Sequence, residues 1–379
     1  MDPLTKERRG IALFRDHLRG ESLLFHQPRH IILAKETSDI LPALSAAEAA
    51  LDAGYWLAGY ISYEAGYLLD PALERLLPPR RTCPLLALGV FDEPSPSECI
   101  TTNDARPARL SNFSAAWSFA DYRHRFDLLH RHLHEGDCYQ GNLTFPIRAA
   151  WDGDPLALFN HLSERQPVRY ASFIDLHGPV VVSLSPELFF NVSEDGSIEA
   201  HPMKGTMPRG GTPEEDNAQK LALKNDPKNQ AENRMIVDLL RNDIARISAV
   251  GTLDVPELFR IESYPTVHQM VSRVRARLRP ATTFSDIFKA LFPCGSITGA
   301  PKISAMKILR DLEPEPRGVY CGAIGWAAPS GRMRFSVAIR TISLFPGGKA
   351  VYNVGGGVVL DSTAEAEYAE CMLKARFAF

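Results

Sequence analysis

The sequence predicts an α+β fold, in which antiparallel strands are interspersed with helices. Short segments rich in β-branched and aromatic residues follow one another with only turn residues between them, which is typical of antiparallel pairing. The clearest of these turns is the Asp-Gly pair Asp195-Gly196, a strong signal for a hairpin. Longer segments with helix start signals, such as the possible N-caps Ser118 and Asp121, lie between groups of strands.

The composition is that of an ordinary globular protein in water, with 45% hydrophobic and 23% charged residues. A net charge of −3 gives no reason to expect a nucleic acid or an anionic membrane as a partner. No apolar run is long enough to cross a bilayer, and the N-terminus lacks the apolar core of a signal peptide. The six cysteines are scattered without a CxxC pair, which indicates reduced thiols. We therefore expect a cytoplasmic location.

The chain is expected to have an N-terminal structural portion, residues 1–100, and a catalytic portion, residues 113–379. The segment Asp92–Asn112 is rich in Pro, Ser, Thr and Asp, which predicts a linker or a long crossover between them. The elements expected in the first portion are a short helix between Arg8 and the first strand, strand His30–Ala34, helix Pro42–Asp52 and strand Tyr55–Tyr63.

Periodicity and turn signals predict further helices and strands in the second portion. The expected helices are Ser118–His134, Pro155–Glu164, Pro213–Leu240, Phe284–Leu291, Pro301–Leu312 and Ser362–Phe377. The expected strands are Cys138–Ala149, Arg169–Leu176, Pro179–Leu184, Leu188–Val192, Ser197–His201, Thr252–Glu262, His268–Leu278, Gly318–Ala328, Met333–Leu344 and Lys349–Val359. An interruption is expected at Asp226-Pro227, because the residue before a proline disfavours helix. Ser362 is the expected N-cap of the last helix, with Glu365 at the capping-box position.

Lys204 stands out within the segment His201–Gly210. Proline and glycine on both sides predict a turn or loop that leaves a strand, where the backbone can approach a ligand closely. A lysine that loses solvent there has a pKa below its usual value of about 10.4, and its neutral amine becomes a nucleophile. Taken alone, a solvated surface lysine is the commoner case.

Two further residues are candidates for acid–base or hydrogen-bonding chemistry. Glu187 is flanked by apolar strand residues, and desolvation would raise its pKa and make it a general acid. The alternative is a carboxylate at a strand edge that points to water. His268 could donate a hydrogen bond to a substrate oxygen, although a core histidine bonded to the backbone is at least as common.

Carboxylates on two predicted helices are candidate ligands of a metal ion. Glu367 and Glu370 are three residues apart on the last helix, so both lie on one face, and Glu232 lies on another helix. Carboxylates that converge from separate helices would suit Mg²⁺. A solvated helix face is the usual alternative for isolated helical glutamates.

Two glycine-rich segments offer places for close backbone approach. Cys294–Lys302 leads into a helix, and its N–H groups could hold a carboxylate. Gly355–Gly357 follows a strand. Neither segment is a phosphate-binding fingerprint, and a pair of tight turns is the structural alternative. Arg340 is a candidate to pair with an anionic substrate, or else a member of a buried ion pair.

The order of these motifs closely resembles that of the chorismate-utilising enzymes, over roughly Phe119–Lys374. The motifs are Lys204-Gly205-Thr206 with Pro208-Arg209, Glu232–Asp243, Gly295–Lys302, Gly355–Gly357 and Glu365–Glu370. The resemblance implies one α+β unit of the anthranilate synthase component I type. Its two large antiparallel sheets are packed together with helices outside, and the active site lies between the halves.

Two positions separate the branches of this family. Anthranilate synthases resemble this chain but carry alanine where Lys204 stands, and isochorismate synthases carry a lysine base where this chain has Gln140. Lys204 together with Gln140 therefore resembles the aminodeoxychorismate synthase branch. Gly141 departs from the family, in which valine is more usual, and a wider pocket is one consequence to test.

The resemblance also implies roles for single residues. Lys204 would attack C2 of chorismate, Glu187 would protonate the departing C4 hydroxyl, and ammonia would resolve the covalent intermediate at C4. Glu232 and Glu370 would bind Mg²⁺ directly, and Glu367 through water. His268 is the third catalytic candidate. The candidates for substrate binding are Gln140, Thr206, Thr298, Gly299, Arg340, Gly355, Gly356, Gly357 and Lys374. A glutamine amidotransferase subunit would supply the ammonia.

Other functions remain open at this point. The chain could be an anthranilate synthase component I that has acquired a lysine, with an aromatic, fluorescent product. An isochorismate-type hydroxylation is disfavoured by Gln140. A non-catalytic chorismate-binding protein would be favoured by loss of Glu187, Glu232 or Lys204, and all three are present. The segment Glu21–Leu24 lacks a convincing motif for the tryptophan that some family members bind.

Overall fold

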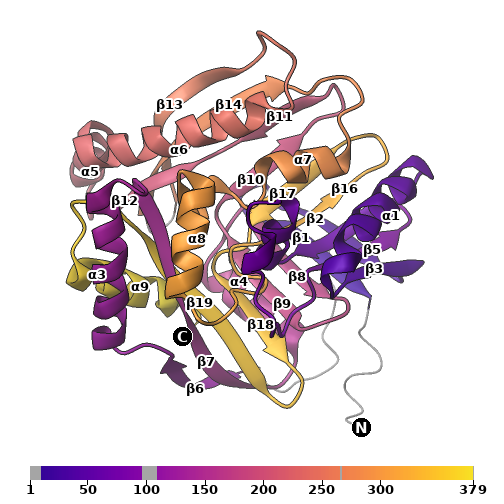
Figure 1. Ribbon diagram of the computed structural model, residues 1–379, viewed down its shortest axis with the longest axis horizontal. Helices are drawn as coiled ribbons and strands as arrows, with labels where there is room; N and C mark the ends of the chain where they lie inside the picture. The colour runs from indigo at the N-terminus through magenta and orange to yellow at the C-terminus, as the bar shows by residue number, and fades with distance from the viewer. Residues whose placement is uncertain (1–9, 96–108, 265–266, 379) are drawn as a thin grey trace.

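The computed structural model describes residues 10–95, 109–264 and 267–378. Two large antiparallel sheets carry helices on their outer faces (Figure 1), so the predicted α+β architecture is confirmed. Both sheets contain strands from before and after residue 100. The division into portions 1–100 and 113–379 stays a prediction, and residues 96–108 of the expected linker lie outside the described ranges.

The first sheet has nine strands, all paired antiparallel. In spatial order they are β15 (Gly299–Ala300), β7 (Gln140–Asp152), β19 (Lys349–Val358), β18 (Thr341–Phe345), β9 (Val180–Ser185), β8 (Tyr170–Asp175), β1 (Ile11–Asp16) and β2 (Glu21–His26), with β6 (Arg109–Ala115) beside β7. The strand β15 at one edge pairs Gly299 with Gly141.

The second sheet has ten strands. In spatial order they are β12 (Met203–Pro208), β14 (Val267–Arg277), β11 (Ser197–Ala200), β10 (Leu188–Val192), β17 (Met333–Val337), β16 (Ala323–Ala327), β4 (Trp56–Ile61), β5 (Leu86–Phe91) and β3 (His30–Ala34), with β13 (Asp254–Ser263) beside β14. The edge strand β12 carries Lys204.

Three apolar clusters hold these layers together. One cluster contains residues from strands of both sheets, among them Phe25, Tyr60 and Trp326. The two sheets therefore pack face to face. The other two clusters lie between each sheet and its helices. The helices are α1 (Ile40–Asp52), α2 (Gly66–Leu69), α3 (Phe119–Glu135), α4 (Pro155–Arg165), α5 (Pro213–Asn225), α6 (Pro227–Ala245), α7 (Phe284–Leu291), α8 (Lys302–Leu312) and α9 (Ala364–Ala375).

Local signals explain several helix boundaries. Ser118 caps α3 by accepting from the backbone N–H of Asp121, whose carboxylate accepts from Ser118 in return. The helix ends at Gly136, which has a φ of 81° that favours glycine. The predicted break at Asp226-Pro227 is confirmed, because Asp226 caps α6 and Pro227 is its first residue.

The structure corrects four local expectations. The N-terminal segment before His30 contains the hairpin β1–β2 and no short helix among its described residues. Met333–Leu344 is not one strand, because Arg340 has a φ of 50° and the chain passes there from β17 to β18 in the other sheet. Thr363, not Ser362, caps α9 by accepting from the N–H of Ala366. Glu365 pairs with Arg123 instead of completing a capping box.

Candidate active site

Lys204 lies in a β-bulge of the edge strand β12 and not in a loop as the sequence predicted. Two residues, Lys204 and Gly205, stand opposite the single residue Met270 of β14. Gly205 has a φ of 89°, and a side chain there would meet Asn229 of α6 at 2.9 Å. The bulge therefore needs glycine beside Lys204, and it redirects the strand where the lysine projects.

The amine of Lys204 has no hydrogen bond or ion pair with any residue that the structure describes. Burial lowers its pKa, and the positive charge of Lys374 lowers it further. Glu232, Glu187 and Glu370 act in the opposite direction without reversing the shift. A half-buried lysine with a lowered pKa and no partner can present a neutral amine to a ligand.

Glu187 lies between β9 and β10 and is only 5% exposed. Its backbone is held at both ends, since its N–H donates to Ser185 Oγ and its carbonyl accepts from the N–H of Val337. Burial raises the pKa of the carboxyl to about 7, although a hydrogen bond with Ser296 lowers it in part. Oε1 has no hydrogen-bond partner within the described chain. Glu187 therefore has a pKa raised toward neutrality, as desolvation predicted, and it can donate a proton near neutral pH.

The side chain of Gln140, the first residue of β7, is fully buried. Neither its Nε2 nor its Oε1 has a hydrogen-bond partner among the described residues. A buried amide without partners costs on the order of a few kcal/mol, which a polar ligand would recover. A methyl group added at Gly357 would lie 2.6 Å from Gln140 Nε2 and 3.0 Å from Lys204 Nζ. Strands β7, β12 and β19 thus bring Gln140, Lys204 and Gly357 together.

The glycine run of β19 fits between its neighbours at every position. A side chain at Gly355 would meet Thr144 at 2.6 Å, and one at Gly356 would meet Glu367 Oε2 at 2.8 Å. Lys374 Nζ donates to the carbonyl of Gly355 at 3.1 Å. The sequence predicted that other groups approach the backbone of Gly355–Gly357 closely. The short distances to Thr144, Glu367, Gln140 and Lys204 agree with that prediction.

Gly357→Ala is expected to lower kcat/KM for the substrate about tenfold or more, because the methyl group would displace Gln140 and Lys204. The melting temperature should change little, since the flexible ends of two side chains can move aside. Gly211→Ala is the matched control, because its methyl group would meet only the carboxylate of Glu215. Unchanged steady-state kinetics in Gly357→Ala would exclude this position from the substrate site.

The three predicted metal ligands influence one another electrostatically. Burial raises the pKa of Glu367, and the charges of Glu370 and Glu232 raise it further against a hydrogen bond from Ser362. Glu370 pairs with Lys374 at 2.8 Å, and that cation outweighs burial and lowers the pKa of Glu370. The oxygens of the three glutamates do not all lie within 4.8 Å of one another. Carboxylate oxygens are suitable ligands for a hard cation such as Mg²⁺, but these three carboxylates are not close enough together here to form a compact ligand set.

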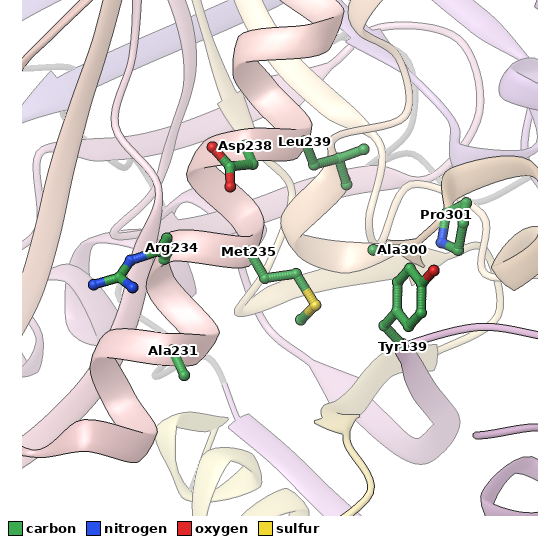
Figure 2. Close-up of a pocket in the computed structure, with 8 residues that line it drawn as sticks. All are labelled: Tyr139, Ala231, Arg234, Met235, Asp238, Leu239, Ala300 and Pro301. Atoms are coloured by element: carbon green, nitrogen blue, oxygen red, sulfur yellow. The ribbon is translucent and has the colours of Figure 1, made fainter. Parts of the chain in front are cut away.

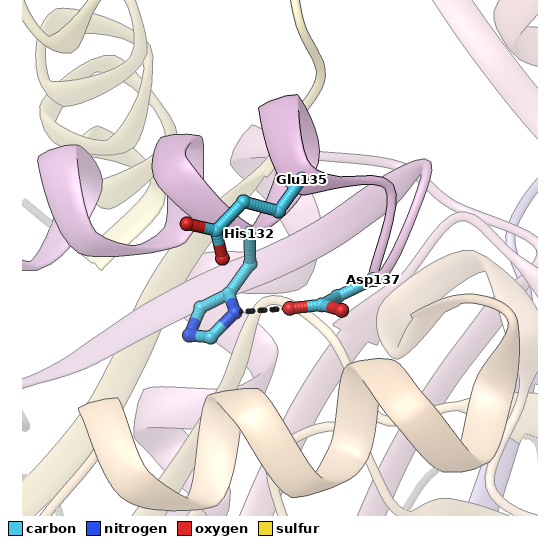
Figure 3. A group of neighbouring side chains, drawn as sticks. All are labelled: His132, Glu135 and Asp137. Carbon is cyan, nitrogen blue, oxygen red and sulfur yellow. Dashed lines mark hydrogen bonds and ion pairs between the residues drawn. The ribbon is translucent and has the colours of Figure 1, made fainter.

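Figure 3 shows the group of His132, Glu135 and Asp137, which does satisfy this distance within the described part of the chain. His132 Nδ1 and Asp137 Oδ2 lie 2.7 Å apart, at the C-terminal end of α3. Glu135 and Asp137 are exposed and His132 is half-buried. No sequence pattern points to this surface group, and the hydrogen bond between His132 and Asp137 explains why two of its members lie so close together.

Thr298 and Gly299 lie beside Gln140. Thr298 is buried, and its hydroxyl lies within hydrogen-bonding distance of the carbonyls of Cys294 and Gly295. A side chain at Gly299 would meet the carbonyl of Gln140 at 2.1 Å, so only glycine fits. The glycine-rich segment therefore packs directly against the start of β7, as a turn and as part of the site.

Arg340 and Thr206 have different surroundings. Arg340 is half-buried, burial lowers its pKa, and its guanidinium has no partner among the residues described. The buried ion pair that was its alternative is therefore absent from this part of the structure, which leaves Arg340 available for an anionic ligand. Thr206 is exposed and its Oγ1 accepts from Gln269 Nε2 at 2.9 Å.

His268 is fully buried in β14 and both of its ring nitrogens have partners. Nε2 lies 2.8 Å from Asp216 Oδ1, and Nδ1 lies 2.9 Å from Ser263 Oγ. The structure gives it no contact with Lys204, Glu187 or Gln140. Its hydrogen bond to a substrate oxygen stays a prediction, and the ring would first have to leave one of these partners.

Gly141 does not create additional space. A methyl group at this position would meet the fully buried Leu129 of α3 at 2.8 Å. Leu129 thus fills the volume that a larger residue would take, and it does so from the apolar cluster outside the sheet. The wider pocket considered from the sequence is not found.

A groove of about 470 Å³ is lined by chain segments that also carry residues of the candidate site (Figure 2). Tyr139, Ala231 and Ala300 line it, and these residues directly neighbour Gln140, Glu232 and Gly299 in the chain. Met235 of α6 points toward the ring of Tyr139, which is 66% exposed. A second cavity, of about 580 Å³, lies between the sheets and is lined by Glu21–Leu23 among others.

The candidate site brings together a lysine amine without a partner, a buried glutamate with a raised pKa and an amide without a partner. A comparison with known families agrees with this arrangement. The family described as chorismate binding enzyme matches residues 12–379. The chain belongs to this family. The resemblance to chorismate-utilising enzymes that the sequence predicted is thereby confirmed.

Curated relatives carry two different names. "Aminodeoxychorismate synthase component 1" of Salmonella typhimurium is 42% identical over 274 residues, which are 71% of this chain and 60% of that protein. "Anthranilate synthase component 1" of Aeropyrum pernix is 37% identical over 83% of this chain and 75% of that protein. The chain covers 57–64% of the length of three bacterial relatives with the first name.

A solved structure supports the fold. Anthranilate synthase component I from Streptococcus pneumoniae superposes with a TM-score of 0.78 at 25% identity, covering 97% of this chain and 90% of that one. The predicted anthranilate synthase component I-like architecture is thus confirmed. Among the described helices, none is both long and apolar enough to cross a membrane.

Ser296 and Ser362 are contacts of the site that the sequence did not reveal. Ser296 is hydrogen-bonded to Glu187, and Ser362 Oγ donates to Glu367 at 2.7 Å. Ser296 lies within a segment selected for its glycines, and Ser362 was assigned to helix capping. Serines carry no distinguishing pattern, so only the folded structure identifies these contacts.

Proposed function

We propose that this protein aminates chorismate at C4 to give 4-amino-4-deoxychorismate, for the synthesis of 4-aminobenzoate and folate. The observation that carries the proposal is the unpartnered amine of Lys204 beside the buried, unpartnered amide of Gln140. The 41–42% identity to relatives named aminodeoxychorismate synthase component 1 supports it. A nucleophile at this position favours a covalent route over direct displacement.

The reaction then proceeds in two displacements. Lys204 Nζ forms a bond to C2, and both ring double bonds shift, from C1–C2 and C5–C6 to C1–C6 and C4–C5. The C4–O bond breaks, and the hydroxyl leaves as water with the proton of Glu187. Ammonia then forms a bond to C4, both double bonds shift back, and the Nζ–C2 bond breaks to release Lys204 as the neutral amine. A proton lost from the new C4 ammonium group returns to Glu187. The sum is chorismate and ammonia to aminodeoxychorismate and water.

Polar groups without partners among the candidate residues would position the substrate. Gln140 can donate and accept a hydrogen bond at once, and Arg340 offers an unpaired cation to a carboxylate. Gly355–Gly357, Thr298 and Lys374 complete the surroundings. A polar ring with two carboxylates fits such a set of donors and cations.

Mg²⁺ belongs to the proposal as a cofactor. Glu232, Glu367 and Glu370 would hold it, directly or through water, and it would neutralise and orient a substrate carboxylate. The raised pKa of Glu367 beside two other carboxylates is the observation in favour, because a cation would relieve that repulsion.

Glu232→Gln is expected to raise the Mg²⁺ concentration for half-maximal activity about tenfold or more, because it removes a charged oxygen ligand. Titration of activity and of Mg²⁺ binding by calorimetry would check this. Glu214→Gln, an exposed glutamate in the first turn of α5, is the matched control. Equal Mg²⁺ affinity in Glu232→Gln and the wild type would remove Glu232 from the ligand set.

The ammonia would come from a glutamine amidotransferase subunit. The words "component 1" in the names of the relatives support a partner component. We also propose a cytoplasmic location, supported by free thiols at Cys83, Cys138, Cys294, Cys321 and Cys371.

A product assay tests the proposal. The protein is incubated with chorismate, Mg²⁺ and ammonium at mildly alkaline pH, with and without an aminodeoxychorismate lyase, and products are identified by mass spectrometry. We expect 4-aminobenzoate only with the lyase. Anthranilate without the lyase would establish the second candidate, which the 37% identity over 83% of this chain favours. Chorismate binding without turnover would indicate a non-catalytic protein.

A further inference from the structure

A buried ion pair lies behind the candidate site, outside the groups used above. Arg317 and Glu313 are 4% and 7% exposed. Arg317 Nε donates to Glu313 Oε2 at 2.7 Å, and Nη2 donates to Glu313 Oε1 at 2.8 Å. This bidentate geometry fixes the plane of the guanidinium.

The remaining donors of Arg317 hold the backbone of two site segments. Nη1 donates to the carbonyl of Ile297 at 2.9 Å, and Nη2 donates to the carbonyl of Asn142 at 2.7 Å. Ile297 directly precedes Thr298, and Asn142 lies two residues after Gln140. Glu313 Oε1 also accepts from the N–H of Thr144 at 2.9 Å. One ion pair therefore joins the start of β7 to the glycine-rich segment.

The backbone of Arg317 is itself held by Glu64 from the first hundred residues. Glu64 is 3% exposed, and its carboxylate accepts from the N–H groups of Arg317 at 2.6 Å and Gly318 at 3.0 Å. The guanidinium lies 4.4 Å from the centre of the Tyr63 ring. Both the backbone and the side chain of Arg317 are thus fixed by independent contacts.

We propose that Arg317 is a positioning residue for the substrate site, which acts by holding Gln140 and Thr298 in register through the carbonyls of Asn142 and Ile297. For the identity of the substrate this inference rests on the proposed function. A buried ion pair is weak as a source of stability, but its fixed directions can place neighbouring groups. A displacement of about 1 Å in a site can cost on the order of a hundredfold in rate.

Arg317→Lys tests this role, because a lysine keeps the positive charge but cannot serve two carboxylate oxygens and two carbonyls in one plane. We expect kcat/KM for chorismate to fall about tenfold or more, and the Kd for chorismate to rise. The decisive measurement is a double-mutant cycle with Gln140→Ala. In the Gln140→Ala background, Arg317→Lys should cost several-fold less than it does in the wild type, because one of the two groups that it positions is gone.

Asp154→Ala is the control for a purely structural effect. Asp154 is buried and caps α4, which packs on β8 and β9 away from Lys204. Its loss should lower the melting temperature without changing kcat/KM or Kd. If Arg317→Lys does not fold, Glu313→Gln replaces it in the same cycle, since it keeps the size of the side chain.

Two outcomes would overturn the inference. One is a folded Arg317→Lys or Glu313→Gln variant with the kinetics and Kd of the wild type. The other is a double-mutant cycle in which the two fold-losses in kcat/KM multiply, so that Arg317→Lys costs as much in the Gln140→Ala background as in the wild type. The Kd measurement needs no turnover, so a wild type that binds chorismate without aminating it would refute the proposed function alone.

Discussion

Lys204→Ala should abolish formation of aminodeoxychorismate, with a loss of about a thousandfold or more in kcat. The substitution removes the only amine that the described site presents without a partner, so no covalent intermediate can form. Chorismate should still bind, because Gln140 and Arg340 remain. Quenched samples analysed by mass spectrometry would give the rate, and any anthranilate formed in its place would be detected by its fluorescence.

Lys224→Ala is the matched control for this experiment. Lys224 is an exposed residue in the last turn of α5, so its loss removes a lysine from the same helix without touching the site. Its kinetics should equal those of the wild type. Unchanged aminodeoxychorismate output in Lys204→Ala would remove Lys204 as the nucleophile.

Glu187→Gln should lower kcat by about a hundredfold to ten-thousandfold, because an amide cannot protonate the departing hydroxyl. The pH profile provides a second readout. Burial raises the pKa of Glu187 to about 7, so the acid form is present below that pH and is lost as the pH rises through it. The lowered pKa of Lys204 has the opposite consequence, since the neutral amine increases with pH.

The wild type should therefore show a bell-shaped profile of kcat/KM, measured at a fixed concentration of unprotonated ammonia. Glu187→Gln should lose the descending limb and keep the ascending one. Glu194→Gln, an exposed glutamate of the nearby hairpin, is the control. A descending limb that persists in Glu187→Gln would assign the general acid to another group.

The sequence predicted the helices better than the ends of the strands. Local signals such as the possible cap Ser118 and the helix break at Asp226-Pro227 act within a few residues, and the structure has both. The break of the expected strand at Arg340 depends on the chain crossing between two sheets, which no local signal encodes. The hairpin β1–β2 was missed because its pairing with β8 supplies the burial that its own residues do not reveal.

The candidate site was also predicted only in part, because local sequence patterns reveal some of its residues and the fold alone reveals the others. Lys204 and Glu187 stand in unusual local contexts, and the structure gives both the burial that those contexts predicted. His268 shows the limit, because its partners Asp216 and Ser263 come from other elements. Arg317 lacks any local pattern, and only the folded chain reveals its contacts with Asn142 and Ile297.

The covalent intermediate is the central claim, and mass spectrometry of the peptide that contains Lys204 tests it most directly. The protein is mixed with chorismate and Mg²⁺ in the absence of ammonia, quenched rapidly and digested. We predict an adduct equal to chorismate less one water on the peptide that contains Lys204, and its disappearance when ammonia is added. Product formation by the wild type without any such adduct, or an equal adduct in Lys204→Ala, would contradict the account.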